Sequence, residues 1–225
     1  ARASREKLEW LLTSAVAAGH NLVRVWGGGP VPPPVFYDLA DELGGMGWQD
    51  LPYACAVYPA SPAHLDEAAA ETRDIVRSLQ THPSVVVWGG NNEVEASFDW
   101  FPRVRLGDVE RYKREYVSLF VETVGKAVSE ADFDRRPYLD SSPSNGLLAP
   151  NSPPTDKAWG DVTDPTRGDV HFYSYDTDCE DEATYPSALF VSEHGFPSVS
   201  TELALWAQRL RAGGGGMRME DMVRA

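Results

Sequence analysis

The sequence is poor in cysteine. Its 225 residues contain only two, Cys55 and Cys179. Two cysteines so far apart match neither a zinc-ligand spacing nor the disulfide framework of a small secreted protein. We therefore expect two buried thiols and no metal site, and the redox compartment stays open.

Basic residues are scarce as well. The chain has 20 Lys and Arg against 34 Asp and Glu, a formal net charge of −14. Such an acidic protein is a poor partner for nucleic acid or for an anionic membrane surface. No apolar run approaches the roughly 18 residues that a membrane-spanning helix requires. These two absences exclude nucleic-acid binding and membrane insertion as expected functions.

Nucleotide-binding motifs are also missing. Residues 27–29 are three consecutive glycines, but neither the G-x-G-x-x-G fingerprint nor a Walker A sequence surrounds them. We expect no cofactor.

The sequence is nevertheless rich enough in apolar residues for one domain with a core. Hydrophobic residues make up 42% of the chain, including 7 Trp, 9 Tyr and 8 Phe. Segments with strand patterns alternate with segments of helical periodicity, which is typical of a parallel α/β sheet. The expected strands are 21–26, 46–50, 85–88, 137–142, 169–175 and 189–193. The expected helices are 4–18, 35–43, 62–81, 112–128 and 201–211.

Polar residues follow nearly every expected strand, which favours a closed barrel over an open doubly wound sheet. In a (β/α)8 barrel of the TIM type, all strands end at one face, where the active site is built. We expect a truncated barrel over residues 1–211, containing strands two to seven and lacking the first and the eighth. The glycine-rich tail, 212–225, is expected to be disordered.

The most informative stretch is 82–93, His-Pro-Ser-Val-Val-Val-Trp-Gly-Gly-Asn-Asn-Glu. Its Val-Val-Val-Trp run predicts a strand buried on both faces. Asn91, Asn92 and Glu93 follow directly. The simplest alternative is a strand that ends in a solvated turn.

A second acid, Glu193, follows the last expected strand. Strands spaced ~4.8 Å apart and tilted ~36° close to a radius of roughly 7.5 Å. Glu93 and Glu193 would leave strands four and seven, which places their carboxyl groups roughly 6 Å apart. That separation is close to the ~5–5.5 Å of retaining glycosidases.

Several segments resemble the catalytic barrel of β-mannosidases, within glycoside hydrolase family 2. The most specific are Trp-Gly-Gly-Asn-Asn-Glu at 88–93 and Ser-Glu-His-Gly-Phe at 192–196. The other matching segments are 21–29, 36–44, 48–50 with 54–59, and 168–173. The resemblance runs, with gaps, from residue 1 to about residue 202.

The resemblance implies a retaining exo-β-mannosidase that removes terminal non-reducing β-D-mannose from oligosaccharides, as in N-glycan degradation. Glu93 would be the acid/base and Glu193 the nucleophile. The residues implied to hold the sugar or to flank the nucleophile are Arg24, Trp26, Asp50, Asn92, His171 and Tyr173. Family members also carry accessory β-sandwich domains, and an animal member would be lysosomal.

Alternatives stay open for individual residues. Asp50 and Tyr173 could serve as hydrogen-bonding groups at strand ends, Arg24 as part of a buried ion pair, and His171 as a buried histidine. The whole chain could have another sugar preference within the family, or be a catalytically silent carbohydrate-binding remnant. Because two strands would be unpaired, we expect the isolated chain to have little or no turnover.

Overall fold

The computed structural model describes residues 4–100, 109–146 and 159–196. The chain divides into two units. The first comprises Ala1–His171 and Ser187–Ser192, and the second comprises Phe172–Pro186 and Glu193–Ala225. The expected helix at 201–211 and tail at 212–225, and hence the boundary between them, lie outside the described residues.

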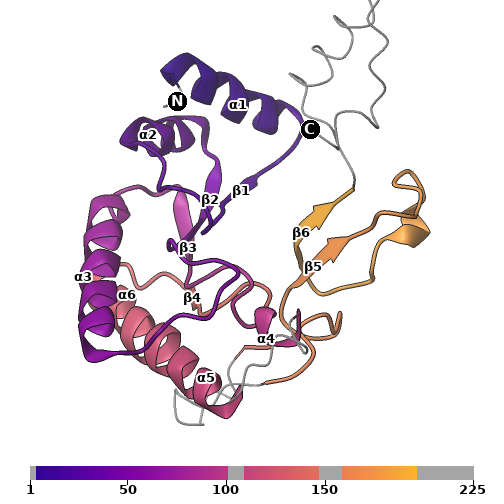
Figure 1. Ribbon diagram of the computed structural model, residues 1–225. Coiled ribbons are helices and arrows are strands. Elements are labelled where there is room, and N and C mark those ends of the chain that lie inside the picture. The colour runs from indigo at the N-terminus through magenta and orange to yellow at the C-terminus, as the bar shows by residue number, and fades with distance from the viewer. Residues whose placement is uncertain (1–3, 101–108, 147–158, 197–225) are drawn as a thin grey trace, which may run out of the picture. The chain divides into compact units, whose positions relative to one another are not determined.

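A four-stranded sheet forms the centre of the first unit (Figure 1). Its strands are β1 (Leu22–Val25), β2 (Met46–Asp50), β3 (Val85–Gly89) and β4 (Tyr138–Leu139), in that order. All neighbouring pairs are parallel. Because parallel strands end at the same edge, the segments that follow these strands lie together.

Capping residues mark several ends of the first three helices. The Ser4 side chain caps α1 (Arg5–Ala17), and the Ser61 side chain caps α3 (Pro62–Leu79), which has a proline in its first turn. Between them, α2 (Pro34–Leu43) ends at Gly44, whose φ of 68° is left-handed. Leu8 and Leu12 of α1 are buried, and α1 packs against α2.

The helix expected at 112–128 is interrupted. α5 (Val109–Tyr116) continues into a π-helix, Val117–Val124, and then into α6 (Gly125–Ala131). Within the π-helix, the Thr123 hydroxyl donates a 2.7 Å hydrogen bond to the carbonyl of Ser118, five residues earlier. Periodicity alone does not reveal this widening.

The sequence of residues 94–108 predicts a loop with exposed aromatic side chains, and this prediction is wrong for the part that is described. A short helix, α4 (Ser97–Trp100), begins there. Phe98 is only partly exposed and packs against the rings of Tyr116 and Trp159.

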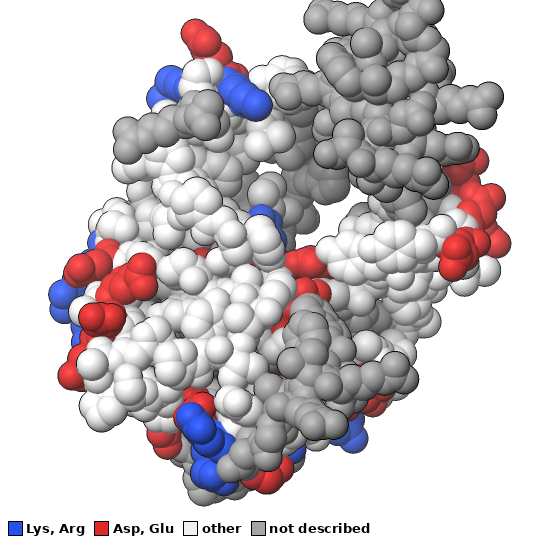
Figure 2. All heavy atoms as spheres, in the orientation of Figure 1, with Lys and Arg blue, Asp and Glu red and all other residues white. Residues whose placement is uncertain are grey.

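Helices α3 and α6 lie side by side along the sheet (Figure 1). Between helices and sheet lies the apolar core, where Trp88, Leu119 and Val124 are fully buried. Acidic and basic side chains are interspersed on the face of the first unit shown in Figure 2. Among the described residues, no helix is both long and apolar enough to cross a membrane.

The last two strands are β5 (Val170–Tyr173) and β6 (Val191–Gly195). They form a separate two-stranded sheet, and a short 3-10 helix, Glu182–Thr184, lies between them in the sequence. The fold is therefore α/β with a parallel sheet, as expected. The truncated barrel is not confirmed, because the described strands form two sheets and no closed one.

β4 is short, because only two of the expected residues 137–142 form a strand. Beyond Leu139, side chains add to the backbone hydrogen bonds between this segment and the one after β3. Asn91 Nδ2 donates to the Asp140 carbonyl at 2.7 Å, and Ser141 Oγ donates to Asn91 Oδ1 at 2.8 Å.

Gly89 and Gly90 leave room at the end of β3 for side chains that pack against the backbone. Two glycines after a strand predict a turn, but neither has a left-handed φ. A Cβ at Gly89 would overlap the Asp50 carboxylate, and one at Gly90 would overlap the Tyr138 hydroxyl. Glycine is required because neighbouring side chains pack directly on the backbone.

A buried carboxylate joins β3 to the end of α6. Asp132 Oδ2 accepts hydrogen bonds from Trp88 Nε1 at 3.0 Å and from the backbone N–H of Arg136 at 2.9 Å. Its Oδ1 pairs with the Arg136 guanidinium at 2.5 Å. Burial raises the pKa of Asp132, but these donors outweigh burial, and the pKa lies below its ordinary value.

Replacing Asp132 by Ala should therefore lower the free energy of unfolding by about 3–5 kcal/mol, because Arg136 and Trp88 Nε1 lose a buried partner. Since the native pKa is depressed, the contribution of Asp132 is present above its unfolded pKa and is lost as the pH falls through the native value. Urea unfolding at neutral and acidic pH measures both effects.

The matched control is Asp134→Ala. Asp134 pairs with the same guanidinium at 3.0 Å, but its side chain is 53% exposed. An exposed pair contributes under about 1 kcal/mol. Equal losses in the two variants would show that burial of Asp132 is not what matters.

Candidate active site

Glu93 lies just beyond β3 in a left-handed conformation, with φ of 59°. For a residue other than glycine this conformation costs on the order of 1–3 kcal/mol and persists only where the surroundings impose it. Here the adjacent Asn92 forms bridges to Ala54 on one side and Ser142 on the other. The Glu93 N–H donates to the Ser142 carbonyl at 2.8 Å. The backbone is therefore fixed from both neighbouring strands.

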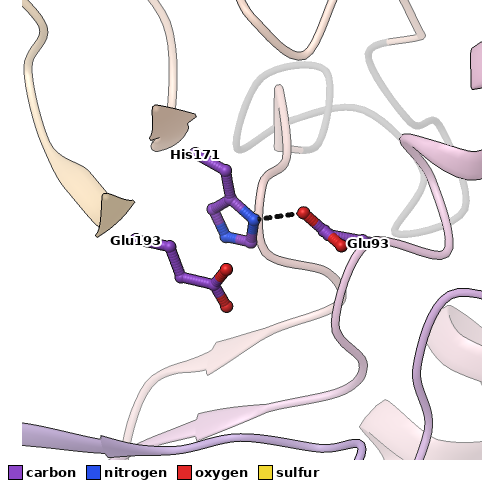
Figure 3. Close-up of side chains that lie close together, drawn as sticks. All are labelled: Glu93, His171 and Glu193. Carbon is purple, nitrogen blue, oxygen red and sulfur yellow. Dashed lines mark hydrogen bonds and ion pairs between the residues drawn. The ribbon is translucent and has the colours of Figure 1, made fainter. Parts of the chain in front are cut away.

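Three side chains contact the Glu93 carboxyl group. His171 Nδ1 lies 2.8 Å from Oε1, as the dashed line in Figure 3 shows. Asn92 Nδ2 donates to Oε2 at 3.2 Å, and the Cys55 thiol donates to the same oxygen at 3.3 Å. Burial raises the pKa of Glu93. The hydrogen bond and charge of His171, with the Cys55 and Asn92 bonds, lower it further than burial raises it.

Arg24 of β1 joins the exits of three strands. Its NH2 group donates to Asp50 Oδ2 at 2.6 Å and to Asn92 Oδ1 at 2.9 Å. Its NH1 group lies 3.3 Å from His171 Nε2. The guanidinium also stacks over the Trp48 ring, 5.3 Å from its centroid. Arg24 thus holds the amide that in turn contacts Glu93.

Asp50, the last residue of β2, is a structural hub of this site. It is 2% exposed, and it accepts hydrogen bonds from Arg24, from the Gly27 N–H at 3.1 Å and from Trp48 Nε1 at 2.9 Å. Burial raises its pKa by more than Arg24 and the other donors lower it. The arrangement matches the alternative of strand-end hydrogen bonding, and contact of Asp50 with a sugar stays a prediction.

Trp26 follows β1 and is 50% exposed. It borders a hollow of about 450 Å³ that also touches Cys55 and Tyr58. An exposed indole is the kind of surface on which a sugar ring stacks, and Cys55 links this hollow to Glu93.

The second unit holds the other predicted acid. Glu193 lies in β6, and its Oε2 accepts a 2.7 Å hydrogen bond from the Tyr173 hydroxyl at the end of β5. The Tyr173 ring packs on Gly195, where a Cβ would lie 2.6 Å from a ring carbon.

The structure therefore gathers five predicted site residues within the first unit: Arg24, Asp50, Asn92, Glu93 and His171. Glu193 and Tyr173 contact each other within the second unit. The meeting of Glu93 with Glu193 across a barrel mouth stays a prediction.

Sequence analysis missed three residues of the site. The expectation of buried thiols is wrong, because both cysteines are exposed. Cys55 reaches Glu93 from a left-handed backbone, with φ of 51°. Ser142 contacts both His171 and Asp169. Only the spacing of Asp169, two residues before His171 on a strand, could have suggested that they share a face.

The chain was compared with protein-family models, with curated proteins and with solved structures. No protein-family model matches the chain. Among curated proteins, it is 42% identical to the beta-mannosidase of Capra hircus over 207 residues, and 33% identical to beta-mannosidase A of Emericella nidulans over 215 residues. These alignments cover 89% and 92% of this chain.

The chain is homologous to the β-mannosidases. It spans only 23% and 22% of the length of these two relatives. Among solved structures, it matches the beta-D-mannosidase from Dictyoglomus thermophilum with a TM-score of 0.63 and 28% identity, over 91% of this chain and 23% of that one. A β-glucuronidase from Bacteroides uniformis, at 18% identity, shares the fold alone, with a TM-score of 0.52.

The Cys55 contact generates a prediction. Cys55→Ala removes one of the hydrogen bonds that lower the pKa of Glu93, so that this pKa should rise. A carbon-13 NMR titration of the Glu side chains, with Glu93 assigned by the loss of its signal in Glu93→Gln, measures the shift.

Cys179→Ala is the control, since Cys179 is equally exposed but belongs to the second unit. It should leave the Glu93 titration unchanged. An unchanged Glu93 titration in Cys55→Ala would mean that the thiol does not influence the carboxyl group.

Proposed function

We propose that this chain carries the acid/base and the nucleophile of a retaining exo-β-mannosidase of glycoside hydrolase family 2. The substrate is an oligosaccharide with a terminal non-reducing β-D-mannose. The observation that carries the proposal is the fixed Glu93 carboxyl group, held by His171, Asn92 and Cys55 directly beyond a buried strand. The identity to β-mannosidases supports the choice of sugar.

The reaction proceeds in two displacements. The Glu193 carboxylate attacks the anomeric carbon while Glu93 gives its proton to the departing glycosidic oxygen. This step forms an ester between mannose and Glu193. Glu93, now ionised, takes a proton from water, and the resulting hydroxide displaces Glu193. Mannose leaves with its anomeric configuration retained, and both acids return to their starting states.

The carboxyl groups of Glu93 and Glu193 have different hydrogen-bond partners. The Tyr173 hydroxyl donates to Glu193 Oε2 at 2.7 Å and holds that carboxyl group in one orientation. Glu93 instead faces a histidine, with which it can share a proton. Because the donors around Glu93 lower its pKa, the proton for the leaving group is drawn from the Glu93–His171 pair and not from a carboxyl group with a raised pKa.

We also propose that the chain forms part of a (β/α)8 barrel in the full-length protein. The two sheets would supply strands two to seven of a barrel, completed by its first and eighth strands and by β-sandwich domains elsewhere in the full-length protein. The relatives, of whose length the chain spans about a quarter, support this. With the barrel open, we expect weak turnover from this chain by itself.

Mass spectrometry after incubation with a 2-fluoro-mannosyl inactivator tests the function, because the method detects even slow, stoichiometric reaction. The peptide containing Glu193 should gain one fluoromannosyl group, and Glu193→Gln should gain none. Labelling by the gluco analogue in preference to the manno analogue would replace mannose by another sugar. Binding of mannosides without any labelling would indicate a silent remnant.

Glu93→Gln should slow hydrolysis of a mannoside with a poor leaving group about 10²–10⁴-fold, because the departing oxygen then receives no proton. A dinitrophenyl mannoside departs without protonation, so its first step should be affected much less. Single-turnover release measured at high protein concentration separates the two. Glu110→Gln, an exposed substitution on α5, is the control and should change neither rate. Equal slowing of both substrates by Glu93→Gln would exclude Glu93 as the acid.

A further inference from the structure

A line of buried polar groups lies behind Glu93, and the proposed reaction does not yet use it. It runs from Asp169 through Ser142 to His171. Ser142 Oγ lies 2.6 Å from Asp169 Oδ2 and 3.0 Å from His171 Nε2. Ser142 is fully buried, Asp169 is 7% exposed, and the His171 side chain is 5% exposed. The other ring nitrogen of His171 faces Glu93.

The hydrogen-bond directions follow from the donors available. An ionised carboxylate only accepts. Asp169 Oδ2 accepts from Ser142 and from Ser192, the latter at 2.5 Å, and its Oδ1 accepts from the Ser144 N–H at 3.0 Å. A serine hydroxyl has a single proton. Once Ser142 directs that proton to Asp169, its oxygen presents only lone pairs to His171 Nε2, so that Nε2 must carry a hydrogen.

Two groups act in the opposite direction: Arg24 at Nε2, and Glu93 at Nδ1 when it is ionised. Arg24 NH1 lies 3.3 Å from the same Nε2, and a donor there favours a nitrogen without hydrogen. However, the Arg24 charge is paired with Asp50 at 2.6 Å, and Arg24 bonds Asn92 at 2.9 Å. Both bonds, and the Ser142 contact, are shorter than the contact from Arg24 to His171. Through Ser142, Asp169 is the group that favours a hydrogen on Nε2.

We propose that Ser142 and Asp169 are positioning residues that keep a hydrogen on His171 Nε2, so that Glu93 and His171 Nδ1 share a single transferable proton. This rests on the proposed role of Glu93 as acid/base. In the first displacement the shared proton goes to the glycosidic oxygen, leaving ionised Glu93 beside neutral His171. In the second, the proton taken from water restores the pair.

The alternative tautomer would work against catalysis. With its hydrogen on Nδ1, His171 donates to ionised Glu93 and stabilises the base form alone. Glu93 would then lack a stored proton for the leaving group. Asp169 thus influences the proton shared by His171 Nδ1 and Glu93 without contacting it, because its effect passes through the Ser142 hydroxyl and the His171 ring.

Nitrogen-15 NMR of the histidine rings tests this on the 225-residue chain without any substrate. The chain has 5 histidines, and His171→Gln assigns the relevant signals. In the unsubstituted chain, His171 Nε2 should be the nitrogen that keeps its hydrogen. Ser142→Ala, which removes the link, and Asp169→Asn, whose amide donates to Ser142, should both move the hydrogen to Nδ1.

Ser192→Ala is the matched control. Ser192 donates to the same Asp169 oxygen, but its 3.2 Å contact is to Ser142 and not to His171. It should leave the tautomer as it was. His82, whose Nδ1 pairs with Asp41 at 2.7 Å, should be unchanged throughout and reports that each variant is folded. Should Asp169→Asn unfold, Ser142→Ala decides.

Three results would overturn the proposal: an unprotonated Nε2 in the unsubstituted chain, an unchanged tautomer in Ser142→Ala, or an equal change in Ser192→Ala. None of them involves hydrolysis. If the chain shows the expected tautomers but does not react with the inactivator, the proposed function is refuted. The proposed role of Ser142 and Asp169 in setting the His171 tautomer would still stand.

Discussion

The site depends on how the backbone is held at Asn92 and Glu93. Asn92 pairs with Ala54 beyond β2 and with Ser142 beyond β4, so the segment after β3 is clamped between its two neighbours. Glu93 therefore takes up a left-handed conformation that it would not adopt in isolation. The energy stored there is offset by the backbone hydrogen bonds of the clamp. Because of that conformation, the carboxyl group stays within reach of His171 and Cys55.

Around this clamp the polar groups are arranged in two layers. Arg24 and Asp50 form a buried ion pair that fixes the amide of Asn92. Asp169 and Ser142 fix the ring of His171 from the other side. Both layers end on Glu93, so its carboxyl group is controlled by Arg24 of β1, Asp50 of β2, His171 of β5 and the segments that follow β3 and β4. Buried networks of this kind hold a geometry well only when each member has a partner.

Much of the fold could be predicted from local chemistry. The Ser4 and Ser61 caps and the left-handed Gly44 mark helix boundaries by mechanisms that operate within one turn. The Val-rich strand before Glu93 was visible as a short apolar run. The candidate site was partly predictable too, because polar residues at the ends of parallel strands converge whatever the details of packing.

The remainder depends on contacts between distant residues. Nothing near Cys55 in the sequence shows that its thiol turns toward Glu93, 38 positions later. The π-helix at Val117–Val124 keeps the apolar pattern of an ordinary helix, so periodicity could not separate the two. Ser142 stands in a Ser-Ser-Pro-Ser run that reads as an ordinary turn, and its role emerges only when β5 brings Asp169 and His171 beside it.

The glycines at the end of β3 have a consequence for how such a scaffold can diversify. Because Asp50 and the Tyr138 hydroxyl occupy the space beside Gly89 and Gly90, neither position can acquire a side chain that would touch a ligand. Residues other than glycine are therefore excluded at the end of β3, the strand that precedes Glu93. New ligand preferences must instead arise in the connecting segments after β1, β2 and β4, at positions other than Ala54, Cys55 and Ser142, which hold the acid in place.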